Sequence, residues 1–153
     1  MSTQAAALTT FDWNTRNVNG VEQIDEWATL TWLHDGKIVC FTINSVERQT
    51  VDAWLKRSYE IVQAWPADVP YLAIQDVTNA TLTPYIREKS AATVALTPKY
   101  LRGRSAVVMS PSVKNHLIRL FVTATLTRQN ASIQRNVFLK KSQAVDWLLQ
   151  FKK

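Results

Sequence analysis

An α/β fold with a five-stranded mixed sheet is what this 153-residue sequence predicts. After an opening strand, short apolar runs alternate four times with segments of helical period, which is the order of β-α units joined by right-handed crossovers. An Asp-Gly pair at positions 35 and 36 marks a tight hairpin. Thr83-Pro84 and Ser110-Pro111 mark helix starts, because a hydroxyl caps the first turn and proline suits its first residue.

The first two strands and the first helix have the clearest patterns. Residues 26–33 alternate in part between polar and apolar, residues 38–43 are apolar, and the turn between them predicts an antiparallel hairpin. Over residues 50–65 the apolar side chains recur at helical spacing, with charged residues on the other side. Two prolines then end this helix before the next strand, at residues 71–77.

The second half of the chain continues the strand-then-helix order. A second helix is expected at residues 84–96, capped by Thr83, and a fourth strand at residues 105–110. Ser110 repeats the capping pattern, so a third helix is expected from Pro111 to about residue 125. The remaining predicted elements are a fifth strand at residues 133–139 and a last helix at residues 142–151.

Length and composition predict one globular domain. A chain that is 46% hydrophobic and holds six tryptophans can bury a single sizeable core. Residues 1–20 stand outside the repeat and are expected to be an N-terminal tail on a domain at residues 21–153, with Phe11 and Trp13 either clamping the tail or binding a partner. No apolar run is long enough for a transmembrane segment and no signal peptide is evident, so we expect a cytoplasmic location.

Charge is divided unevenly along the chain, whose total net charge is +6. Residues 1–76 hold five Lys/Arg and ten Asp/Glu, a net of −5, whereas residues 77–153 hold thirteen and two, a net of +11. Such asymmetry indicates either an anionic partner or two halves that neutralise each other within one fold. We do not expect nucleic acid to be that partner.

The sequence carries none of the familiar catalytic or cofactor motifs. It has three glycines and no Gly-rich phosphate loop, no G-x-S-x-G motif, and two histidines without metal-ligand spacing. Cys40 lies within an apolar strand and is expected to be buried. Ser112 and His116 are spaced for a hydrogen-bonded pair, although a polar residue beside an apolar helix face is the commoner arrangement. We therefore expect no cofactor, no metal and no enzymatic activity.

Several apolar patterns resemble the SpoIIAA-like, or STAS, family and its bacterial STAS/Sec14-like relatives. They are the junction YLAIQDVTNATLTP, the run SAVVMSPSVKNHLIRLFVTATL, and the closing segments VF and AVDWL, within residues 26–151. The resemblance implies a right-handed superhelix of four β-α units and a non-enzymatic binding or regulatory module. In STAS antagonists of anti-sigma factors, a serine at the start of the second helix is phosphorylated. Here Thr83 stands at that junction after the strand-end Asp76, so the switch serine is missing, and Thr81 or Thr83 would be the alternative acceptor.

Two non-enzymatic functions stay open. The first is a protein-interaction module, whose partner could be a second copy of the chain in a homodimer. Its interface would lie around Ile118 and Val122 on the third helix. That helix is apolar over a wide arc, which packing between the sheet and other helices would also explain. The second is a module that binds a small anionic ligand or a lipid. A ligand module predicts an apolar cavity, whereas an interaction module predicts a filled core and an exposed apolar patch.

A binding site is expected at the carboxyl ends of the parallel strands, where helix N-termini offer free N–H groups. The polar residues there suit a phosphate or an acidic side chain, although Thr83, Ser110 and Ser142 are also explained as helix caps. The candidate residues are Asp76, Thr78, Asn79, Thr81, Thr83, Ser110, Ser112, Lys114 and Lys141.

Overall fold

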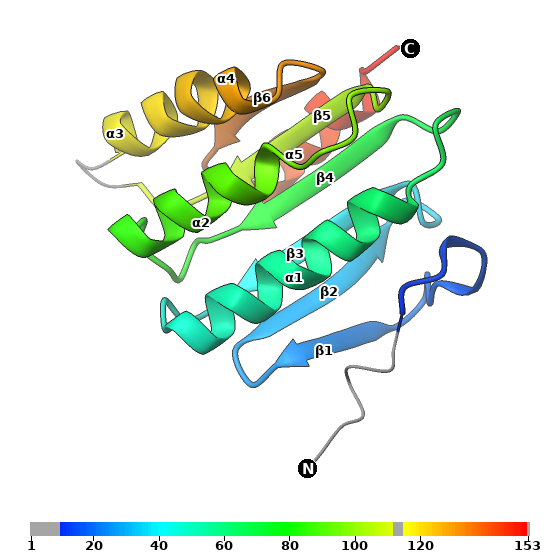
Figure 1. Ribbon diagram of the computed structural model, residues 1–153, viewed down its shortest axis with the longest axis horizontal. Helices are drawn as coiled ribbons and strands as arrows, with labels where there is room; N and C mark the ends of the chain where they lie inside the picture. The colour runs from blue at the N-terminus through cyan, green and yellow to red at the C-terminus, as the bar shows by residue number, and fades with distance from the viewer. Residues whose placement is uncertain (1–9, 112–114, 153) are drawn as a thin grey trace.

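A computed structural model describes residues 10–111 and 115–152, in which six strands form one mixed sheet in chain order (Figure 1). The strands are β1 (Val21–Asp25), β2 (Ala28–Leu33), β3 (Ile38–Ile43), β4 (Tyr71–Asp76), β5 (Gly103–Val108) and β6 (Ile133–Phe138). The first three pair antiparallel, and β3 to β6 pair parallel. The helices are η2 (Trp13–Thr15), α1 (Arg48–Ala64), α2 (Pro84–Val94), α3 (Asn115–Leu120), η3 (Phe121–Leu126), α4 (Thr127–Gln129) and α5 (Lys141–Leu149).

Helices cover both faces of this sheet. The helices α1, α2 and the continuous α3–η3–α4 lie on one face, and α5 lies on the other (Figure 1). Since the parallel strands follow one another in chain order, crossovers of one hand place their connecting helices on the same face. The helix α5 follows the last strand and is free of that constraint. None of the helices in the described residues is both long enough and apolar enough to cross a membrane.

The sheet has one strand more than the five predicted. The missed strand is β1, which has the sequence VEQID and pairs with β2 at the edge of the sheet. Its pattern is weak because an edge strand needs few apolar residues, and Val21 is 65% exposed. A long-range pair holds it instead: Arg57 of α1 donates two hydrogen bonds to the Glu22 carboxylate, at 2.8 and 2.9 Å.

The predicted helix starts are right at one cap and wrong at two. Thr83 caps α2, because its hydroxyl accepts a hydrogen bond from the Ile86 amide at 3.2 Å. The third helix was expected from Pro111, but Pro111 lies outside any helix, and the Ser110 hydroxyl donates to the Thr78 carbonyl at 3.2 Å. Residues 112–114 lie outside the described residues, and the described part of this helix, α3, runs from Asn115. Ser142 lies inside α5, whose N-cap residue is Lys140 without a side-chain bond.

The segment before the sheet packs against the core. Phe11 is 8% exposed, and the ring centroids of Trp13 and Trp65 lie 4.6 Å apart. Arg16 donates a hydrogen bond to the Gly36 carbonyl at 3.1 Å, which ties the segment to the β2–β3 turn. The described part of the tail, residues 10–20, is thus clamped by Phe11 and Trp13, one of the two roles expected for them.

Candidate functional site

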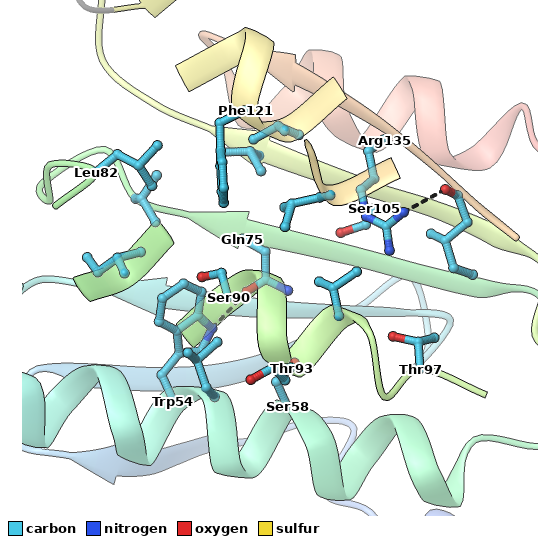
Figure 2. Close-up of a pocket in the computed structure, with 18 of the residues that line it drawn as sticks. Trp54, Ser58, Gln75, Leu82, Ser90, Thr93, Thr97, Ser105, Phe121 and Arg135 are labelled. Atoms are coloured by element: carbon cyan, nitrogen blue, oxygen red, sulfur yellow. Dashed lines mark hydrogen bonds between the residues drawn. The ribbon is translucent and has the colours of Figure 1, made fainter. Parts of the chain in front are cut away.

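An apolar cavity of about 110 Å³ lies between the sheet and the layer formed by α1, α2 and η3 (Figure 2). Three strands, β4 to β6, form its floor. The side chains that line it include Trp54, Ser58, Val62, Gln75, Leu82, Ile86, Ser90, Val94, Ser105, Val107, Phe121, Val122, Leu126 and Arg135.

Small side chains on the floor help to leave this space open. Alternate residues of a strand point to the same face, and Ala73 of β4 pairs with Ser105 of β5, which pairs with Arg135 of β6. Of these three residues, Ser105 and Arg135 line the cavity, and the small side chain of Ser105 fills little of the volume beneath the helices. Gly103 pairs with Tyr71 in the preceding row, where a Cβ would lie 1.8 Å from the Tyr71 carbonyl oxygen. The two strands therefore approach closely beside the cavity.

The roof of the cavity includes a π-helix. Residues Phe121–Leu126 form η3, and Phe121, Val122 and Leu126 line the cavity. Runs of π-helix are rare in proteins, and those that occur are often found at functional sites. The widened turn shifts side chains out of the usual helical register. This irregular segment thus coincides with the hollow part of the structure.

Arg135 brings a positive charge to the cavity wall. It stands between Ile133 and Val137, which are buried and face the same helix layer. Its Nη1 atom donates to the carbonyls of Asn130 at 2.5 Å and Ile133 at 2.9 Å. Within residues 10–111 and 115–152, no hydrogen bond or ion pair involves its Nε or Nη2 atom. Burial lowers the pKa of Arg135 to about 10, which leaves the guanidinium protonated at neutral pH.

The other polar groups of the cavity wall are neutral. The Gln75 side-chain oxygen accepts a hydrogen bond from the Trp54 indole at 2.8 Å, and Ser90 is a buried hydroxyl of α2. Burial raises the pKa of the Tyr71 phenol to about 12, so this group also stays uncharged at neutral pH. Among the described lining residues, Arg135 alone carries a charge.

The carboxyl edge of the sheet brings five of the predicted site residues together. The Asp76 carboxylate accepts hydrogen bonds from the Thr78 amide at 3.1 Å and hydroxyl at 2.6 Å, and lies 3.4 Å from the Lys141 ammonium. The Ser110 hydroxyl donates to the Thr78 carbonyl, and Asn79 donates to a side chain at the end of β3. These groups largely satisfy one another, and the charge of Lys141 is balanced by Asp76.

The other predicted residues are placed elsewhere. Thr81 lines the cavity, as do Ile118, which is half-buried, and Val122, which is 3% exposed. Ser112 and Lys114, and with them the Ser112–His116 pair, lie outside the described residues. Sequence reasoning missed Arg135, although a signal was present: an arginine occupies the position between two apolar residues of an alternating strand.

Comparisons with known proteins give no match: no family model, no curated protein and no solved structure matches this chain. The STAS resemblance thus stays a prediction. In the described part of the chain, no group of three or more His, Cys, Asp or Glu residues is placed to hold a metal ion. Cys40 is buried, as expected.

Proposed function

We propose that this chain is a non-enzymatic binding module that holds a small, mainly apolar ligand in the cavity between the sheet and η3. The observation that carries the proposal is the cavity itself, with a predominantly apolar wall. An apolar cavity is the feature that separates a ligand-binding module from an interaction module with a filled core. Ile118 and Val122, the candidate interface residues, line this cavity and so favour the ligand alternative.

The volume of the cavity limits the size of its ligand. An engineered apolar cavity of about 150 Å³ takes up benzene, so about 110 Å³ suits a single ring or a chain of roughly six carbons. The π-helical roof would let the wall adjust around such a body. Ligand pockets of this kind combine apolar walls with a few placed polar groups, here Gln75, Ser90, Ser105 and Arg135.

The side chains around the cavity favour binding over catalysis. Among the described lining residues there is no His, Cys, Asp or Glu, and hence no general base beside the serine hydroxyls. The order of the four β-α units supports a relationship to the SpoIIAA-like modules, which we propose together with a regulatory role.

The proposal is tested by titrating the protein with two neutral probes, toluene and 1-hexanol, followed by NMR of its backbone amides. We expect saturable shifts that centre on η3 and the facing strands. Ser105→Leu would fill part of the cavity and should abolish the shifts. Gln143→Leu, at an exposed position of α5 beneath the other face, is the matched control and should bind as wild type does. Absence of saturable binding to wild type, or unchanged binding to Ser105→Leu, would overturn the proposal.

A further inference from the structure

The guanidinium of Arg135 is held in a fixed orientation. Its Nη1 atom is anchored by the carbonyls of Asn130 and Ile133, which belong to the same turn and strand as the arginine. An arginine has five N–H donors in a planar fork. With the two on Nη1 committed, the Nε–Nη2 edge remains for another acceptor, and it is oriented by the structure before any ligand arrives.

The same chain shows what this edge binds. Arg57 uses its Nε and Nη2 atoms to hold the two oxygens of Glu22, at 2.8 and 2.9 Å. Such a bidentate pair matches the spacing of carboxylate oxygens and is the strong form of a charged hydrogen bond. Arg135 presents the equivalent edge at the cavity, where none of the described residues supplies a carboxylate.

A charge without a counterion is costly on the covered face of a sheet. Arg135 occupies a position between Ile133 and Val137 where the alternation of the strand would place an apolar residue, and its neighbours in the cavity wall are neutral. A ligand with one negative charge would balance it, while the apolar wall takes up the rest of the molecule. This complementarity of charge and surface defines the chemical class of the ligand.

From these observations we infer that the cavity binds a small carboxylic acid as its anion, held by the Nε–Nη2 edge of Arg135. The body of the ligand lies against η3 and α2, and it is an aromatic ring or a chain of about six carbons. This inference rests on the proposed function, since it assigns the headgroup of a ligand that the cavity must first accept.

Calorimetry at neutral pH with matched acids and neutral analogues tests the inference. The probes are benzoate and hexanoate, their amides benzamide and hexanamide, and phenyl phosphate, with toluene as the purely apolar reference. Wild type should bind the two acids at least about tenfold more tightly than the amides. Phenyl phosphate, whose headgroup is larger and more highly charged, should bind more weakly than benzoate.

Three variants assign the effect to Arg135. Arg135→Met should weaken acid binding by at least about tenfold and leave toluene binding within about twofold. Arg135→Lys keeps the charge but lacks the fork, so it should recover only part of the acid affinity. Lys141→Ala removes a positive charge at the carboxyl edge, where Lys141 pairs with Asp76, and should bind the acids as wild type does.

The outcomes separate this inference from the proposed function. If wild type binds neither acids nor neutral probes, the cavity is not a ligand site and both ideas fail. If neutral probes bind as tightly as the acids, or phenyl phosphate binds more tightly than benzoate, the cavity stands and the carboxylate assignment is overturned. Equal acid binding by wild type and Arg135→Met, in the presence of normal toluene binding, would also overturn it. A loss confined to Lys141→Ala would move the anion site to the carboxyl edge.

Discussion

Replacing Arg135 by methionine should stabilise the ligand-free protein. Burial lowers the pKa of Arg135 from 12.5 to about 10, a difference of about 2.5 units. At about 1.4 kcal/mol per unit, keeping the guanidinium charged in the folded protein costs about 3 kcal/mol. The two hydrogen bonds to the carbonyls of Asn130 and Ile133 offset this by about 1 kcal/mol each. The net gain expected from Arg135→Met is about 1 kcal/mol.

The sign of the pH dependence follows from the same values. A base whose pKa is lower in the folded state than in the unfolded state destabilises the fold at every pH below its folded pKa. For Arg135 the full cost is therefore present below pH about 10 and disappears as the pH rises towards 12.5. The stability difference between wild type and Arg135→Met should consequently be the same at pH 7 and pH 9.

Urea unfolding at these two pH values measures the difference, which corresponds to an increase of about 3 °C in melting temperature for a chain of this size. The matched control is Arg57→Met. Arg57 pairs with Glu22 and Glu60, so this variant should lose about 1–2 kcal/mol. The reasoning is refuted if Arg135→Met loses more than about 1 kcal/mol while Arg57→Met behaves as expected, because Arg135 would then be a structural residue.

Four further variants test the fold. Thr83→Ala should lower the free energy of unfolding by about 1 kcal/mol, because α2 loses its cap. Ser142→Ala, inside α5, should change it by less than about 0.5 kcal/mol. Equal effects of the two variants in denaturant titrations would contradict this assignment of the caps. Trp13→Ala should cost about 2 kcal/mol in the same titrations if the N-terminal aromatics belong to the core, and no loss would refute that. Gly103→Ala should lower the free energy of unfolding by more than about 2 kcal/mol, because the added Cβ would meet the Tyr71 carbonyl of β4. A melting temperature equal to that of wild type would show that the two strands can separate without penalty.

The elements that could be predicted are those whose pattern is local. The β2–β3 turn places His34, Asp35 and Gly36 at φ values of +52°, +56° and +82°, which suits the Asp-Gly signature in the sequence. The cap at Thr83 is likewise decided within four residues. The strand β1 could not be recognised in this way, because it depends on an edge position and on the distant partner Arg57.

The cavity depends on neighbours from three different strands. Gln75, Ser105 and Arg135 are each unremarkable for a strand, and they come together in one cavity wall only once the register of β4, β5 and β6 is known. Local sequence does not specify the register between parallel strands that are separated by helices. The volume of the cavity also depends on η3, and no pattern in the sequence predicted its π-helical turn. The only local signal of the site was the alternation of apolar residues in β6, which places Arg135 at a position that faces the helices.

Choosing a candidate binding site by residue type gives a different site from choosing it by which charged residue lacks a partner. The carboxyl edge was predicted because lysines and hydroxyls gather there, yet Lys141 faces Asp76, and Asp76 is itself engaged by Thr78. A charge that already has a counterion gains little from a ligand, because the ligand must displace the existing partner. Arg135 has no such partner among the described residues, and its neighbours cannot provide one. A carboxylate therefore gains more free energy by pairing with Arg135 than with Lys141, although the side chains around Arg135 are far less polar.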